Sequence, residues 1–250
     1  MKNSYQRMSG EALRKDRFAA TNSTGFVVGA ILAGMFIGFG VLLAFTAGGM
    51  LEGVPSSKLI MGCTFGIALS LVVICGAELF TGNNMILMAG RLDEKITTKD
   101  TILLWIACWC GNWLGAALLS YIFEMTGLDS GSTAAAISTA AIAKVSAGVD
   151  ELLARGILCN ILVCLAVWSG YRTKSDAAKL IMVFWCLLAF FATGFEHSVA
   201  NMTLLNLAYL DGAITFWQMA YNLIFVTLGN VVGGVMLAIM YKIVSTDAER

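Results

Sequence analysis

The chain has 250 residues, of which 58% are hydrophobic and 13% charged, and its mean hydropathy is +0.80. Soluble domains carry roughly 25% charged residues, so this composition excludes an ordinary water-soluble domain and predicts a single membrane domain of several spans. The formal net charge is zero, which offers no basic surface to nucleic acid.

Residues 1–24 precede the first apolar run and carry five cations in their first 17 positions. No apolar core lies between these cations, so we expect no cleavable signal peptide. The segment is predicted to be cytoplasmic, either as a short amphipathic helix at the membrane surface or as a solvated tail. The cations are Lys2, Arg7, Arg14, Lys15 and Arg17.

Six apolar segments follow and predict an all-α membrane domain at residues 25–244, with a cytoplasmic tail at 245–250. A straight span needs about 20 residues, which the first, third, fourth and sixth segments fit. The second would extend about 48 Å as one helix, and the fifth is longer still. The segments are residues 26–48, 59–90, 102–123, 152–171, 178–210 and 216–244.

Polar clusters interrupt the two long segments, "ELFTGNN" at residues 78–84 and "EHSVAN" at residues 196–201. Each cluster begins 18 or 19 residues after its segment starts, so both spans are predicted to be broken at the same depth. The breaks are attributed to Gly82 and to side chains that compete for backbone hydrogen bonds. These side chains belong to Thr81, Asn83, Asn84, Ser198 and Asn201.

The two halves of the chain also resemble each other in sequence. "NNM" ending at Met85 corresponds to "ANM" ending at Met202, and "GNWLG" from Gly111 corresponds to "GNVVG" from Gly229, at offsets of 117 and 118. Because three spans end on the opposite side of a membrane, the repeat predicts two inverted halves. Interrupted segments at matching positions of such halves indicate a binding or permeation site. The glycines predict close helix packing.

The positive charges of the connections predict the orientation. Thirteen Lys and Arg residues fall on the side of the termini and at most three, Lys58, Lys144 and Arg155, on the other. Both termini are therefore predicted to be cytoplasmic.

Ionisable residues at membrane depth indicate functional sites by default. His197 is the only histidine, and we favour a functional role because a neutral imidazole can donate, accept and take up a proton. Glu78 and Glu196 would repel an anion if ionised in a pore. They are predicted to be structural, held against backbone N–H groups or near an interface.

Two further polar residues leave alternatives open. Lys144 is either a snorkelling loop lysine or one turned inward to attract anions. Asn160 is either a helix–helix contact or a functional amide.

Seven cysteines lie in apolar runs without a CxxC pair, and we predict small core residues rather than a metal site. The chain has one histidine and cannot supply two histidine ligands to a haem, so no cofactor is predicted. The cysteines are Cys63, Cys75, Cys108, Cys110, Cys159, Cys164 and Cys186.

The motifs "AELFTGNNM", "GNWLGA", "GILCNILVCLAVW" and "GFEHSVANM" together resemble the formate/nitrite transporter family of bacterial pentameric anion channels. The resemblance runs from about Gly25 to the C-terminus, and "TGNNM" and "EHSVANMTL" look more like the nitrite branch. It implies an aquaporin-like fold of two inverted three-helix halves, with one pore per protomer and a lipid-filled axis in a homopentamer of the inner membrane. It also makes the N-terminal segment similar to a cytoplasmic helix proposed to respond to pH.

The resemblance also implies roles for individual residues. His197 would be the pore histidine and Thr81 the hydroxyl that faces it. Lys144 would draw anions into the outer vestibule, with Asn160 as its asparagine neighbour. Independently of the resemblance, Asn84 and Asn201 are predicted to be structural polar residues at the two breaks. The apolar constrictions would involve Phe65, Leu69, Leu79, Phe80, Val163 and Phe190.

The predicted substrate is a small monovalent weak-acid anion, most of all nitrite, with formate and hydrosulfide as alternatives. Dry apolar rings would stop a fully charged ion, so His197 with Thr81 must hydrogen-bond the anion or pass it a proton. We favour transient protonation, which would make protons a second partner. Two other classes of function are weaker. The sequence has no nucleophile–base pair and no cofactor motif, which an embedded enzyme or redox subunit would need. It also has no NPA repeats, which a water or glycerol channel would carry.

Overall fold

The computed structural model describes residues 1–246, which form eleven helices and no strand. The predicted tail at 245–250 and the charge of Arg250 therefore lie largely outside the described residues. Six of the helical stretches are long and apolar enough to cross a membrane, which confirms the six predicted segments and the all-α class. These stretches are Ser23–Met50, Ser57–Cys75, Thr98–Met125, Val149–Arg172, Asp176–Thr193 and Phe216–Ser245.

The helices follow the predicted order, with additional pieces at the two long segments. Four helices lie outside the six spans: α1 (Lys2–Thr21), α5 (Phe80–Leu92), α7 (Gly131–Val145) and α10 (Ser198–Leu210). Two short helices, α3 (Ser57–Phe65) and α4 (Ile67–Cys75), together make one span. The remaining spans are α2 (Ser23–Met50), α6 (Thr98–Met125), α8 (Val149–Arg172), α9 (Asp176–Thr193) and α11 (Phe216–Ser245).

Irregular backbone separates α4 from α5 and α9 from α10. Gly76 and Gly194 begin these stretches with φ angles of 77° and 81°, a conformation that favours glycine because it has no Cβ. Gly82 lies inside α5, so the prediction that it causes the first break is wrong. The predicted competing side chains also lie within α5 and α10 and not in the irregular stretches.

Glycines bring pairs of helices into backbone contact. A Cβ on Gly115 of α6 would lie 2.0 Å from the carbonyl oxygen of Ile31 in α2, and one on Gly233 of α11 would lie 2.5 Å from that of Ile157 in α8. Both glycines belong to the GNxxG motifs, which confirms the predicted close packing.

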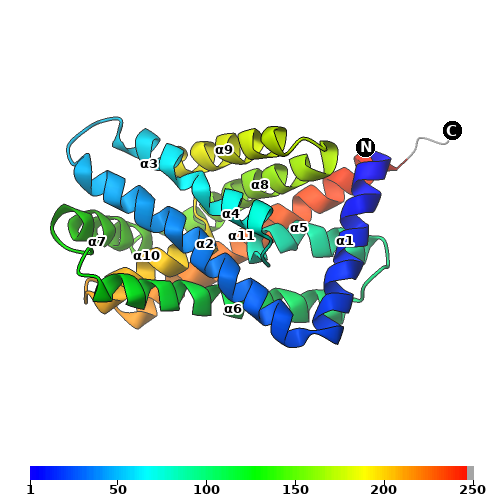
Figure 1. Cartoon of the computed structure of the whole chain (residues 1–250), viewed down its shortest axis with the longest axis horizontal. Helices are drawn as coiled ribbons and strands as arrows, with labels where there is room; N and C mark the ends of the chain where they lie inside the picture. Colours follow the sequence, from blue (N-terminus) through cyan, green and yellow to red (C-terminus); the bar gives the residue numbers. More distant parts are fainter. Residues whose placement is uncertain (247–250) are drawn as a thin grey trace.

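Two helices lie at opposite ends of the bundle, with α1 across one end and α7 at the other (Figure 1). Helix α1 buries Tyr5, Met8 and Ala12, and it packs on α5 beside the end of α11. The N-terminal segment is therefore a docked helix, not a solvated tail. Helix α7 was not predicted.

The outer surfaces of the long helices expose large apolar side chains such as Ile106, Leu114 and Trp185, as expected for contact with lipid. Four cysteines are buried, but Cys63, Cys75 and Cys110 are exposed and unpaired. The prediction that all seven are core residues is wrong for these three, because a thiol behaves as a small hydrophobe and an apolar solvent tolerates it at the surface.

Candidate functional site

The break between α9 and α10 is held by one asparagine of α11. The Nδ2 of Asn230 donates to the carbonyl oxygens of Gly156 (2.8 Å) and Glu196 (2.9 Å). Its Oδ1 accepts from the N–H of Ser198 at 2.9 Å. Backbone groups at membrane depth must find partners within the protein, and this buried amide supplies three of them.

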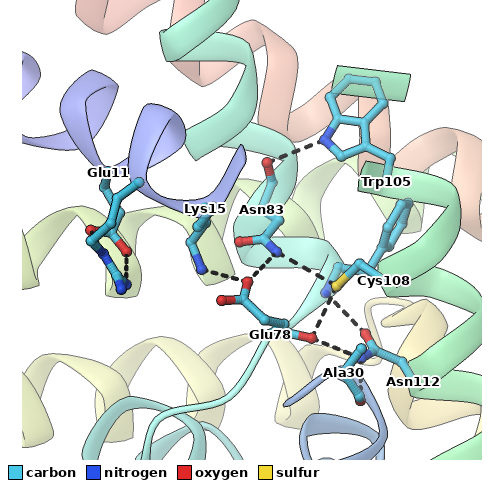
Figure 2. A network of polar contacts seen from close by, with 10 residues as sticks. Glu11, Lys15, Ala30, Glu78, Asn83, Trp105, Cys108 and Asn112 are labelled. Carbon is cyan, nitrogen blue, oxygen red and sulfur yellow. Dashed lines mark hydrogen bonds and ion pairs between the residues drawn. The ribbon is translucent and has the colours of Figure 1, made fainter. Parts of the chain in front are cut away.

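Asn112 of α6 does the same at the break between α4 and α5 (Figure 2). Its Nδ2 donates to the carbonyl oxygens of Ala30 (2.7 Å) and Glu78 (2.9 Å), and its Oδ1 accepts from the N–H of Phe80 at 2.9 Å. We call Asn112 and Asn230 the asparagine clamps. They stand 118 residues apart, at the asparagine of each GNxxG motif.

The second break positions His197 as the N-cap of α10. The ring Nδ1 accepts from the backbone N–H of Ala200 at 3.0 Å, so the hydrogen of the neutral ring must be on Nε2. Nε2 lies 3.0 Å from Oγ1 of Thr81 and therefore donates to it. Thr81 keeps its own hydroxyl hydrogen for another acceptor, and we assign these hydrogens from the network.

Apolar side chains enclose one side of the His197 ring. The Phe190 ring is stacked on it at 5.7 Å between centroids, and Phe65 meets Phe190 edge-on at the same distance. The space they enclose is too tight for a water molecule. Its lining consists of Ile37, Phe65, Leu69, Leu79, Val163, Leu187, Phe190 and His197.

Five of the six predicted constriction residues thus come together, whereas Phe80 is buried without lining this space. Side chains of successive helical residues point roughly 100° apart, and Phe80 follows Leu79 at the start of α5. Ile37 and Leu187 were not predicted, because nothing in an apolar run distinguishes a pore-facing side chain from a packed one.

A cavity of about 670 Å³ lies on the other side of His197 and of Phe190. Lys144 of α7 lines it, with its Nζ 2.7 Å from Oε2 of Glu196. The lysine side chain is 21% exposed and that of the glutamate 2%. Of the two alternatives for Lys144, the inward orientation is therefore found.

Glu196 also accepts a hydrogen bond from Nδ2 of Asn201 at 2.6 Å. Asn201 donates in addition to Oδ1 of Asn222, whose Nδ2 donates to the carbonyl oxygen of Lys144. Of the two predicted settings for this carboxylate, the one held by backbone N–H groups is wrong, because Lys144 neutralises the charge and the Asn201 amide hydrogen-bonds it. The charged residues that line the cavity are Glu52, Lys58, Lys144, Arg155 and Glu196, three basic and two acidic.

Glu78 occupies the equivalent place at the first break. Its Oε2 accepts from Nζ of Lys15 at 2.5 Å and from Nδ2 of Asn83 at 2.9 Å, and Figure 2 shows Lys15 reaching it from α1. The lysine and glutamate side chains are only 9% and 11% exposed. Each break thus carries a carboxylate held by one lysine and one asparagine. The role of Lys15 was missed because it lies 63 residues from Glu78.

Asn160 and Asn84 lie beside the second clamp. Nδ2 of Asn160 donates to the carbonyl oxygen of Asn230 at 2.6 Å, and both asparagines pack on Gly234. Neither side chain contacts Thr81 or His197 by a hydrogen bond in the described part of the chain. The structure therefore brings together Thr81, His197 and the apolar ring, with Lys144 in the adjoining cavity and Asn160 one step away.

This arrangement suits an anion better than a cation or a neutral solute. A net-positive cavity ends at the bonded pair of His197 and Thr81, where the Thr81 hydroxyl is the free donor, and dry apolar side chains enclose the other side of the His197 ring. Among residues 1–246, no group of three or more histidine, cysteine, aspartate or glutamate side chains is arranged to hold a metal ion.

Comparison with known proteins gives consistent results. A family model described as formate/nitrite transporter matches residues 2–244. The chain is 39% identical over 252 aligned positions to the nitrite transporter NirC of Escherichia coli. The aligned region covers 97% of this chain and 91% of the relative.

Two solved structures share the fold. A structure described as an FNT family ion channel has a TM-score of 0.93 at 37% identity and covers 99% of this chain and 100% of its own. A pentameric formate channel with formate bound has a TM-score of 0.79 at 28% identity and covers 90% of this chain and 98% of its own.

Proposed function

Because the chain belongs to the formate/nitrite transporter family, we propose that it is a channel for small monovalent weak-acid anions with nitrite as its main substrate. The family consists of transporters and channels, so an enzymatic role is set aside. Similarity to a nitrite transporter over 97% of the chain supports nitrite. Formate is the second candidate, because a similar solved structure is described with formate bound.

The observation that carries this proposal is the bonded pair of His197 and Thr81 at the inner end of the net-positive cavity. An anion would enter the cavity beside Lys144 and exchange part of its water for protein donors. It would then accept a hydrogen bond from the Thr81 hydroxyl, which the Nε2–H of His197 polarises by donating to the same oxygen. The apolar ring excludes larger and doubly charged ions, whose dehydration costs more.

We propose that His197 acts as a neutral hydrogen-bond donor, in contrast to the transient protonation favoured from sequence. To become a proton donor the ring must first hold two hydrogens. That requires Nδ1 to release the backbone N–H of Ala200, which would then lose its partner at the start of α10. N-cap bonds contribute about 1 kcal/mol to helix stability, so the cap opposes protonation.

The assembly is proposed to be a homopentamer with one pore per protomer and both termini cytoplasmic in a bacterial inner membrane. The similar pentameric channel supports the assembly, and the excess of positive charge on the side of the termini supports the orientation. The two asparagine clamps at matching positions support the inverted three-helix halves.

Proteoliposomes loaded with nitrite, formate or hydrosulfide test the substrate. We expect nitrite flux to exceed the others at equal concentration. Faster flux of formate or hydrosulfide would overturn the substrate assignment, and no flux of any anion would overturn the transport proposal.

A potassium gradient with valinomycin tests the role of His197. A potential of about 100 mV changes the free energy of a crossing monovalent anion by about 2.3 kcal/mol, which is about 50-fold in accumulation. Voltage-dependent accumulation is expected for the hydrogen-bond mechanism, whereas voltage-independent uptake with internal acidification would favour protonation.

Thr81→Val and Thr81→Ser form a matched pair for the same site. Valine keeps the shape of the side chain and loses the hydroxyl, and we expect nitrite flux to fall about 10-fold or more because one donor is lost. Serine keeps the donor and is expected to retain most of the flux. Equal flux in the two variants would exclude the hydroxyl from transport.

A further inference from the structure

The cavity beside Lys144 is larger than the passage of the proposed anion requires. Its volume is about 670 Å³, within the roughly 300–1,000 Å³ of pockets that bury drug-sized ligands. Nitrite and formate are anions of a few atoms, and a water molecule occupies only roughly 30 Å³ in the liquid. The cavity therefore has room for a ligand many times the size of the proposed substrates.

Small side chains of α7 keep this space open. The five that line it follow one another at intervals of one and three residues, which places them on one face of the helix. Helix α7 lies at the end of the bundle opposite α1 (Figure 1), so the cavity lies at that end. The five residues are Ala135, Ala136, Thr139, Ala140 and Ala143.

Another part of the wall is apolar and aromatic. Phe45 of α2, Met61 of α3, Phe191 of α9 and Leu204 of α10 line the cavity. The rings of Phe45 and Phe191 meet edge-on at 6.4 Å between centroids, and Phe191 is only partly buried. Because covering apolar surface removes it from water, an aromatic or branched apolar group would gain contacts here that a small polar anion cannot use.

The charged part of the wall favours a carboxylate. An ammonium group has three N–H donors, and Lys144 uses one of them on Glu196 at 2.7 Å. Arg155 is paired with a neighbouring glutamate on α8, but its side chain stays 40% exposed, and Lys58 is exposed as well. With three basic and two acidic residues in the lining, a ligand carboxylate would meet more cations than anions.

The inner end of the cavity is closed to a ligand with an apolar group. His197 and Phe190 line both this cavity and the space beyond it, and that space is too tight for a water molecule. Such a ligand can enter from the side of α7 but cannot continue past the Phe190 ring. Bound there, it would occupy the route that leads to the Thr81 hydroxyl.

We propose that this cavity binds monocarboxylates that carry an aromatic or branched apolar group, and that these ligands block the pore instead of crossing it. The carboxylate would accept charge-assisted hydrogen bonds from Lys144 and the neighbouring cations, while the apolar group would cover Phe45 and Phe191. The block rests on the proposed function, because it presupposes a conducting pore. Binding itself does not depend on transport.

Isothermal titration calorimetry of the full-length protein in detergent tests binding alone. The probe is 3-phenylpropanoate, with 3-phenylpropanamide as the match that lacks the charge and propanoate as the match that lacks the ring. We expect 3-phenylpropanoate to bind with a Kd of about 0.1–1 mM, as a ligand of its size supports. Each matched compound should bind about 10-fold more weakly or worse, because it keeps only one of the two kinds of contact.

A leucine at an exposed lining position of α7 locates the site. Ala143→Leu should project into the cavity and weaken the binding of 3-phenylpropanoate about 10-fold or more, because it fills part of the space. Ala177→Leu makes the same change at an exposed position of α9 that does not line the cavity, and it should bind like the wild type. If Ala143→Leu does not elute as a single species, Ala135→Leu, also exposed and lining the cavity, takes its place.

Nitrite uptake into proteoliposomes tests the block, with 3-phenylpropanoate on both sides of the bilayer. We expect half-inhibition of the wild type near the measured Kd, and about 10-fold more ligand for half-inhibition of Ala143→Leu. Binding without inhibition would overturn the block. Equal binding of the amide, or equal binding by Ala143→Leu and Ala177→Leu, would overturn the site. If no anion crosses at all, the proposed function fails, while calorimetry still decides on the site.

Discussion

The Lys15–Glu78 ion pair joins α1 to the first break, and removing either charge is expected to loosen α1. Breaking a buried pair costs about 3–5 kcal/mol, because the remaining charge stays buried without its partner. The Lys15 and Glu78 side chains are 9% and 11% exposed, and Glu78 retains the hydrogen bond from Asn83 when Lys15 is replaced. We therefore expect the low end of the range, about 3 kcal/mol, which raises the population of locally opened α1 about 100-fold.

Native-state cleavage by chymotrypsin measures this opening. Its sites in α1, Tyr5, Leu13 and Phe18, are unchanged in the variants Lys15→Gln and Glu78→Gln. Each variant is expected to be cleaved about 100-fold faster than the wild type. The double variant should be cleaved no faster than either single variant, because neither charge is then left buried without its partner. That result corresponds to a coupling free energy of about 3 kcal/mol between Lys15 and Glu78.

Lys99→Gln, an exposed position at the start of α6, is the control and should leave the cleavage rate unchanged. Independent effects would make the double variant about 10,000-fold faster than the wild type, and that result would refute the reasoning. Single variants that resist cleavage like the wild type would show that apolar contacts alone hold α1.

Three further predictions concern stability, and each is checked by thermal unfolding of purified protein. Asn230→Ala leaves three buried backbone groups without their clamp and should destabilise the protein by about 3 kcal/mol or more. The control Asn206→Ala breaks no hydrogen bond among the described residues and should cost clearly less. Gly115→Ala places a Cβ 2.0 Å from a carbonyl oxygen and should cost about 1–3 kcal/mol of stability. The control Gly170→Ala in α8, where a Cβ meets no other atom within 4 Å, should be neutral or stabilising. Equal effects of the two variants would contradict the packing argument. Burial opposes the charge of Asp93, but hydrogen bonds from Lys242 and Ser9 outweigh burial and hold the pKa of this carboxyl below its ordinary value. The charged carboxylate therefore stabilises the fold fully above about pH 4, and this contribution is lost as the pH falls through the lowered pKa. Asp93→Asn should therefore lower the unfolding temperature at pH 7 and differ less from the wild type as the pH falls below about 4, and a constant difference would contradict the assignment.

Hydropathy predicted the spans because apolar length is a property of each segment by itself. The matching interruptions that contain Thr81 and His197 could likewise be predicted from sequence offsets, whereas the contact between the two side chains was implied by the family resemblance. Helix α7 was missed because its small residues, "STAAAISTAAIAKV", have no clear apolar face. The pairing of Lys15 with Glu78 was missed because it depends on how α1 docks.

The asparagine clamps show how a correct signal was interpreted too narrowly. The motifs GNWLG and GNVVG were assigned to glycine packing, which is confirmed, but Asn112 and Asn230 within them hold the two breaks. A polar residue at the same place in both halves of an apolar repeat could have indicated a shared backbone contact. Its partners could not be named, because they are carbonyl and N–H groups that every residue possesses.

The order of the clamps along the chain has a consequence for biosynthesis. Each break is held by an asparagine that lies 34 residues after the glutamate it bonds. At about 5–20 residues per second, a ribosome needs roughly 2–7 s to make that stretch. During this interval the newly made break has no clamp, and lipid offers no substitute for the missing bonds. The insertion machinery must therefore keep α9 and α10 away from the open bilayer until the first half of α11 has been synthesised, and His197 takes its final position only then.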